Sequence, residues 1–119
     1  MDQSNVVLRY RDGRTERVPL GEINAEHKSV AVTRDGEQAE VSFAELKAIF
    51  FPRLNPDDEE DTATGSTISV EFADGEVIRG VAHYNPERNG FFLFPHDRSK
   101  NDRIFVVNSA IVSIEVEKL

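Results

Sequence analysis

Four aspartates recur at matching positions in the two halves of this 119-residue chain, and paired carboxylates are the groups that general acid–base catalysis uses. Asp12, Asp35 and Asp74 each precede a glycine, whereas Asp97 follows a histidine. An aspartate before glycine is typical of a tight turn, where its carboxylate accepts a hydrogen bond from the backbone two residues further on. We therefore expect the three aspartates that precede glycine to shape turns, and we do not expect an enzyme.

Three histidines are the other candidates for proton or metal chemistry. His27, His83 and His96 lack the spacing of metal ligands, and the chain has no cysteine that could supply a thiolate. We interpret His83 and His96 as structural side chains on neighbouring strands. The segments NPERNG and RDGRT have the residues of turns, not of a glycine-rich phosphate loop. We expect neither a metal nor a cofactor.

Aromatic and basic side chains around HDRSKNDR (residues 96–103) are the candidates for binding a nucleic-acid strand or a nucleotide. These candidates are Tyr84, Phe91, His96, Arg98, Lys100 and Arg103. Two aspartates in the loop reduce its net charge to +1, which offers a polyanion little attraction. Nucleic acid is therefore not the expected partner, although a single-stranded RNA or nucleotide remains the alternative.

The two halves of the chain repeat one arrangement of apolar residues and Asp-Gly turns. RYRDGRTER (residues 9–17) has its counterpart in EFADGEVIR (residues 71–79). With Asp12 set over Asp74, the apolar positions coincide along most of both halves, and the second half carries three inserted residues. Duplication of one ancestral unit explains this agreement.

Each half is expected to form about five short strands, because apolar and polar residues alternate between turn signals. The expected strands span residues 6–10, 14–20, 29–34, 37–43 and 46–51, and then 67–72, 76–84, 91–95, 103–107 and 111–119. Ser42 and Glu45 have capping-box spacing, which predicts one helical turn. Pro19 is expected at an edge or at the end of its strand. Five bent strands in so short a unit predict a small barrel, with Gly80 at a sharp bend.

Residues 55–66, NPDDEEDTATGS, separate the halves and predict a flexible acidic linker. The expected organisation is a barrel at 1–54, the linker at 55–66 and a second barrel at 67–119. Residues 1–54 carry eight Lys and Arg against nine Asp and Glu, a net charge of −1, and residues 67–119 carry six against eight, a net of −2. The acidity of the chain, −8 in total, therefore lies mainly in the linker.

No apolar run approaches the ~18 residues of a membrane span, and the N-terminus lacks the pattern of a secretory signal. We expect no membrane insertion and a cytoplasmic location.

The second half resembles the Sm-like small barrels in VEFADGEVIRGVAHYN and FVVNSAIVSIEV, with Asn108-Ser109 in place of the Arg-Gly of their RNA-binding signature. Both halves also resemble an uncharacterised bacterial family of short tandem β-domains that combine F-x-D-G with L-K-A-[VI]-F-F, here Leu46 to Phe51. Some members of that family lie beside PilZ, signalling, pilus or secretion modules. The resemblance implies an all-β fold of two tandem five-stranded Sm-like barrels, and no activity.

Two strands, AIFF and GFFLF, are apolar on both faces, although a barrel strand has only one inner face. Their outer faces should therefore be covered, either by the other half or by another chain. The candidate interaction surface is Phe50, Phe91, Leu93 and Tyr84. We expect a non-enzymatic protein-interaction or regulatory adaptor of a bacterial signalling, motility or secretion system, whose partner is another protein or a second copy. An Sm-like binder of single-stranded RNA or a nucleotide is the alternative.

Overall fold

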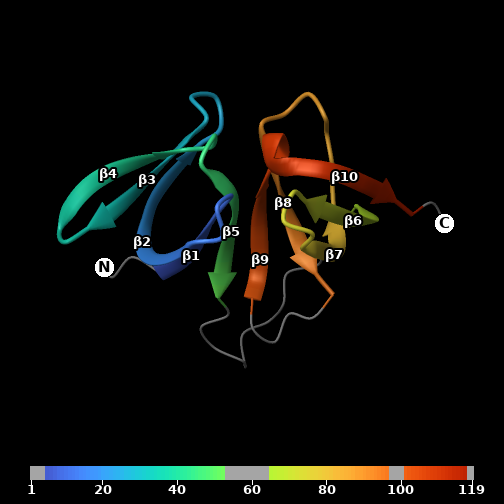
Figure 1. Ribbon diagram of the computed structural model, residues 1–119, viewed down its shortest axis with the longest axis horizontal. Helices are drawn as coiled ribbons and strands as arrows, with labels where there is room; N and C mark the ends of the chain where they lie inside the picture. The colour runs from blue at the N-terminus through green and yellow to red at the C-terminus, as the bar shows by residue number, and fades with distance from the viewer. Residues whose placement is uncertain (1–4, 53–64, 97–100, 118–119) are drawn as a thin grey trace.

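The computed structural model describes residues 5–52, 65–96 and 101–117, and most of these residues are in β-strands (Figure 1). The strands of the first half are β1 (Asn5–Tyr10), β2 (Thr15–Asn24), β3 (Ser29–Arg34), β4 (Glu37–Ser42) and β5 (Leu46–Pro52). Those of the second half are β6 (Ser66–Phe72), β7 (Val77–Ala82), β8 (Gly90–Pro95), β9 (Asn101–Val107) and β10 (Ile111–Val116). A 3-10 turn, η1 (Asn108–Ala110), precedes β10. The expected all-β class is confirmed.

All ten strands belong to one open antiparallel sheet, in the order β10-β6-β7-β8-β9-β5-β1-β2-β3-β4. The expectation of two separate five-stranded barrels is corrected by this order, because β5 of the first half pairs with β9 of the second. In Figure 1 these two strands stand side by side at the centre, and the sheet bends away from them on both sides. The predicted linker lies outside the described residues, except for Gly65 and Ser66.

The two halves of the sheet have the same strand order. In the first half the order is β5-β1-β2-β3-β4, and in the second it is β10-β6-β7-β8-β9. The last strand of each half therefore lies beside the first strand of that half. This correspondence makes β5 and β10 equivalent in position, and it makes β4 and β9 equivalent as well.

Local sequence explains where the strands turn and bend. Asp35 and Gly36, at φ 52° and 81°, form the two-residue turn between β3 and β4. Pro19 lies within β2 where its partner changes from β1 to β3, so its missing N–H interrupts neither ladder. Gly80 lies in mid-β7, where an added Cβ would come within 2.3 Å of the Phe94 carbonyl oxygen. The helical turn expected at residues 42–45 is instead a hydrogen-bonded turn that joins β4 to β5.

The register across β5 and β9 explains why both strands are apolar on two faces. Directly opposite residues of an antiparallel pair point to the same face. Ile49, which faces the core of the first half, lies opposite Phe105, whose ring centroid is 5.7 Å from that of Phe43. Phe50 lies opposite Ile104 on the other face, which is the inner face of the second half. The inner face of each half therefore continues as the outer face of the other, and each half covers one face of the junction.

Candidate functional site

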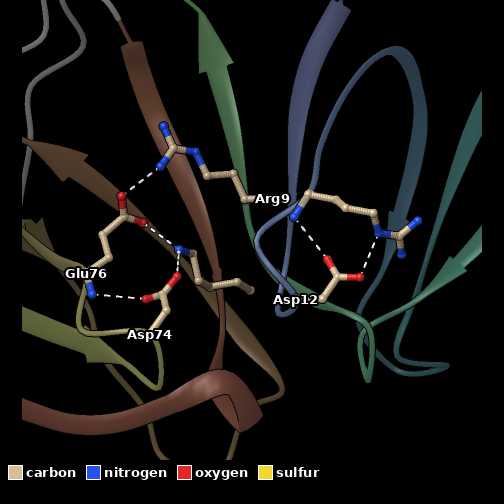
Figure 2. Close-up of polar contacts among 6 residues, drawn as sticks. Arg9, Asp12, Asp74 and Glu76 are labelled. Carbon is tan, nitrogen blue, oxygen red and sulfur yellow. Dashed lines mark hydrogen bonds and ion pairs between the residues drawn. The ribbon is translucent and has the colours of Figure 1, made fainter.

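The two Asp-Gly turns that the sequence singles out have the same hydrogen bonds. In each turn the glycine N–H donates to the carbonyl oxygen three residues before it, Tyr10 in one case and Phe72 in the other. The carboxylates of Asp12 and Asp74 each accept a hydrogen bond, 3.0 Å long, from the backbone N–H two residues further on. These two aspartates shape turns, as expected, and they lie in separate hairpins rather than as a catalytic pair (Figure 2).

The turns differ in what their charged side chains contact (Figure 2). Asp12 pairs with Arg14 of its own turn, at 2.7 Å, and both side chains are exposed. Asp74 instead receives Lys47 from β5, whose Nζ lies 2.8 Å from Asp74 Oδ2 and 2.7 Å from Glu76 Oε1. The second turn is therefore tied to the first half of the chain.

Lys47 is 5% exposed and is the one charged residue buried among the described residues. Its ammonium group lies 5.1 Å from the centroid of the Phe72 ring. Arg9 of β1 completes the cluster, with Nη1 2.7 Å from Glu76 Oε2. Two cations and two carboxylates neutralise each other, so this cluster is suited to holding the halves together rather than to binding an ion.

The Lys47 ammonium, followed by the backbone N–H of Glu76, holds the pKa of Asp74 below its ordinary value. A similar arrangement stabilises the first half. There the Arg34 guanidinium makes two hydrogen bonds to the Glu16 carboxylate, 2.8 and 2.7 Å long, and lowers the pKa of Glu16. The lowered values indicate carboxylates that stay ionised to stabilise the fold, not groups adjusted for proton transfer at neutral pH.

The candidate interaction surface of the sequence analysis lies mostly inside the molecule. Phe50, Phe91 and Leu93 are buried, and Phe50 is covered by the Arg9 guanidinium 4.1 Å from its ring centroid. Tyr84 is half-buried and packs edge-on against Phe91, with centroids 5.4 Å apart. These residues are covered within the chain, so the side chains of Phe50, Phe91 and Leu93 are not available to an outside partner.

The candidate ligand loop is described only in part. Arg98 and Lys100 lie outside the described residues, and His96 is exposed just after β8. The Arg103 guanidinium lies between two aromatic rings, 4.8 Å from the centroid of Phe51 and 4.9 Å from that of Phe92. The structure therefore places Arg103 in an aromatic cluster where β5, β9 and β8 lie side by side. Phe92 is the exposed ring of this cluster, with 37% of its surface accessible.

A feature that sequence reasoning missed is the difference between the last strands of the two halves. β5 is buried over most of its length, because β1 pairs with one of its edges and β9 with the other. β10 occupies the equivalent position but pairs, among the residues that the structure describes, with β6 alone, and none of its own residues is fully buried. Val112 and Val116 of β10 are 60% and 45% exposed. An apolar edge strand without a second partner is a site where another strand can add.

The backbone groups at this edge can be assigned from the pairing. The Glu117 N–H donates to the Thr67 carbonyl oxygen, so odd-numbered residues of the strand direct their backbone groups toward β6. Ile114 and Val116 therefore direct their N–H and C=O groups toward the free edge. Their side chains lie opposite Val70 and Ile68, on the inner face of the second half.

The opposite edge of the sheet, β4, has a different character. Its inner residues Ala39 and Val41 pack on the first half, whereas Glu37, Gln38 and Glu40 are exposed. Charged residues on an edge strand oppose the addition of another strand. The two edges are therefore unequal, and β10 is the apolar one.

A small cavity lies beside the beginning of β10. Its volume is about 120 Å³, and its apolar wall is formed by Phe72, Ala73, Ala110 and Val112. Its polar side is formed by Arg11, Lys47, Asp74 and Ser109, and there Arg11 Nη2 donates to Ser109 Oγ at 2.6 Å.

No group of three or more His, Cys, Asp or Glu side chains within 5–52, 65–96 and 101–117 is arranged to hold a metal ion. Within the same residues, no helix has the length and apolarity that crossing a membrane requires.

Comparison with known proteins identifies a family without an assigned activity. No curated protein matches the chain, and no solved structure matches it. One family model, described as "Family of unknown function (DUF6982)", matches residues 2–118. Since this match covers nearly the whole sequence, the chain belongs to that family of unknown function, DUF6982.

Proposed function

We propose that this chain is a non-enzymatic protein-interaction or regulatory adaptor that binds an extended segment of another protein by strand addition to β10. The observation that carries the proposal is the difference between β5 and β10. They hold equivalent positions, but β5 is covered by β9 and β10 presents exposed Val112 and Val116. A partner strand on β10 would cover it as β9 covers β5.

The proposal places the adaptor in the cytoplasm of a bacterium, in a signalling, motility or secretion system. Its support is the resemblance of both halves to the short tandem β-domains found beside PilZ, pilus or secretion modules. Descent of the halves from one Sm-like five-stranded unit belongs to the same proposal. The shared strand order and the matching Asp-Gly turns support that descent.

Catalysis is not part of the proposal, because Asp12, Asp74 and Glu16 have structural partners, while Asp97 lies outside the described residues. Asp12 and Asp74 bond to backbone N–H groups, and Asp74 also pairs with Lys47. Glu16 is held by Arg34. None of these pairs leaves a carboxylate beside a second unpaired acid or base.

A single-stranded RNA or nucleotide is the second candidate, and the cluster of Arg103, Phe51 and Phe92 favours it. An exposed ring beside a guanidinium can stack on a base. The net charge of −8 opposes it, because a polyanion is repelled. Fluorescence polarisation with a short RNA at two salt concentrations tests this candidate. Tight binding that weakens with salt would replace the proposed function.

Strand addition is tested with a neutral peptide that alternates threonine and valine, labelled with fluorescein. Anisotropy measures its binding to the full chain, and hydrogen exchange locates it. The peptide should slow exchange at Ile114 and Val116, because their N–H groups face the free edge.

Val116→Pro is the variant that tests the edge itself. It removes an N–H that faces outward and leaves the β6–β10 ladder intact, so binding should be lost while the melting temperature changes little. Gln38→Pro is the matched control, since the hairpin pairing directs the Gln38 N–H toward the free edge of β4. Peptide binding that survives Val116→Pro, or that is lost in Gln38→Pro alone, contradicts the proposal.

A further inference from the structure

We infer that the segment bound at β10 is an antiparallel strand that alternates apolar and basic side chains and ends in an aliphatic residue over the cavity beside Val112. This inference rests on the proposed strand addition and names the chemistry of its partner. It draws on the β5–β9 pairing inside the chain, on the charges beside β10, and on the position of the cavity.

The β5–β9 pairing shows how the last strand of a half accepts a neighbour. β9 runs antiparallel to β5, and it places Phe105 opposite Ile49 on the inner face of the first half. In the second half, the side chains of Ile114 and Val116 lie on the corresponding inner face of β10. A partner strand in the same orientation would place every second side chain against these two residues. Those side chains must be apolar, because they complete the open side of a hydrophobic core.

The other face of β10 requires a different side chain. Ser113 lies opposite Glu71 on β6, and Glu115 lies opposite Ser69, so two carboxylates lie diagonally across the strand pair. Both glutamates are exposed, and within the described residues neither makes an ion pair. The neighbouring cation, Arg79, is already paired with Glu117 at 2.6 Å. Lysine or arginine on the outward positions of a partner strand would balance these charges, whereas acidic residues there would be repelled.

The cavity fixes where the partner strand ends. An antiparallel strand that begins beside Val116 reaches Val112 with its C-terminal residues. The cavity lies there, with Phe72, Ala73 and Val112 on its apolar side and the ion pair of Lys47 and Asp74 on its polar side, and its volume is about 120 Å³. A dry cavity of about 150 Å³ accepts a group the size of benzene, so this one has room for one aliphatic side chain.

A second copy of this chain does not meet these requirements through its free β4 edge. β4 and β9 hold equivalent positions in the two halves. On the outer face of its half, β4 has Gln38, Glu40 and Ser42, whereas β9 has Arg103, Phe105 and Val107. Joining β4 to β10 as β9 joins β5 would bring Glu40 beside the apolar inner face at Ile114. Another protein with basic and apolar alternation is therefore the occupant that the charges favour.

Three peptides of equal length separate this inference from the proposed function. They alternate valine with lysine, threonine or glutamate, and their affinities for the full chain are measured by anisotropy. The lysine peptide should bind about tenfold more tightly than the glutamate peptide at about 50 mM salt, which is the effect of two surface charge pairs. The threonine peptide should lie between them, and the difference should shrink at about 500 mM salt.

Variants of the exposed glutamates show which residues cause the difference in affinity between the lysine and glutamate peptides. Changing Glu71→Gln and Glu115→Gln together should remove most of the difference between the lysine and glutamate peptides. Glu37→Gln with Glu40→Gln makes the same change of charge at the β4 edge and should leave the difference unchanged. A threonine peptide that fails to bind would overturn the strand addition itself. If all three peptides bind with equal affinity and Val116→Pro abolishes that binding, the inference of a basic partner would be wrong, while strand addition to β10 would stand.

The cavity is tested by extending the lysine peptide at its C-terminus with leucine or with glycine. The leucine peptide should bind several-fold more tightly, because its side chain is removed from water. Ala73→Phe, a change at the exposed rim of the cavity, should abolish that gain without altering the glycine peptide. Equal affinity of the two peptides would contradict the cavity as part of the site. A dimer of the free chain that Val116→Pro dissociates would instead make a second copy the occupant.

Discussion

The Nζ atom of Lys47, in the first half of the chain, lies 2.7 Å from Oε1 of Glu76 in the second half. Lys47 is buried, while one third of the Glu76 side chain is exposed. The pair therefore joins the two halves at a point that the β5–β9 ladder does not reach. Its counterpart in the first turn, Arg14 with Asp12, joins nothing beyond its own hairpin.

Replacing Lys47 should destabilise the whole chain. Lys47→Ala should lower the free energy of unfolding by about 2 kcal/mol, less than the ~3–5 kcal/mol of a fully buried pair because water reaches Glu76. Urea unfolding followed by circular dichroism measures this change. Arg14→Ala, at the exposed pair, is the matched control and should leave the midpoint nearly unchanged. Equal effects of the two variants would mean that the Lys47 cluster does not join the halves.

Acid should weaken the fold through the same cluster. The pKa of Asp74 is lowered in the folded chain, first by Lys47 and then by the Glu76 N–H. A lowered pKa gives stability that is fully present above the ordinary value of about 3.9 and is lost as the pH falls through the folded value. The melting temperature should therefore fall below about pH 4, and it should fall more in the wild-type chain than in Lys47→Met. Parallel pH profiles of the two proteins would show that Lys47 does not set the Asp74 pKa.

Gly80 should tolerate no side chain. Gly80→Ala would place a Cβ 2.3 Å from the Phe94 carbonyl oxygen and 2.6 Å from Leu93 Cδ2, so β7 and β8 must separate. We expect a loss of about 3 kcal/mol, as for an overpacked core position. Gly21→Ala is the control, because its Cβ would meet the Ala31 carbonyl oxygen at 3.1 Å and needs only a small adjustment. A melting temperature for Gly80→Ala that matches the control would show that the strands separate easily.

Local patterns in the sequence predict the strands and turns well, because these depend on neighbouring residues. The Asp12-Gly13 and Asp74-Gly75 turns follow from the positive φ that glycine adopts and from a short carboxylate that reaches its own backbone. The sequence predicts a bend at Gly80, and what the structure shows there is a close approach of the β8 backbone, the other circumstance that a glycine within a strand marks.

Strand pairing between the halves is not encoded locally, so local patterns predict two barrels where the chain forms one sheet. Phe50 and Phe105 show that both faces of β5 and β9 are covered, but coverage by stacked barrels and by a continuous sheet requires the same apolar residues. The candidate surface is therefore buried within the chain: Phe50 is covered by the other half, as expected, and Phe91 and Leu93 are apolar because they are inside. Val112 and Val116 look like ordinary strand residues until the sheet order shows that β10 has only one neighbour among the described strands.

Phe50 tests whether the junction belongs to one chain or to two. It is 7% exposed, stacks under the Arg9 guanidinium and lies opposite Ile104 of the second half. Phe50→Ala should cost about 3 kcal/mol, because it leaves a cavity in a core that both halves share. Since all the contacts lie within one chain, light scattering should give the same molar mass for the variant and the wild-type chain. Phe92→Ala removes the same ring from an exposed position on the opposite face and should cost less. A lower molar mass for Phe50→Ala, at an unchanged melting temperature, would mean that this ring packs between chains, and β9 would then have to pair with the β5 of a neighbour.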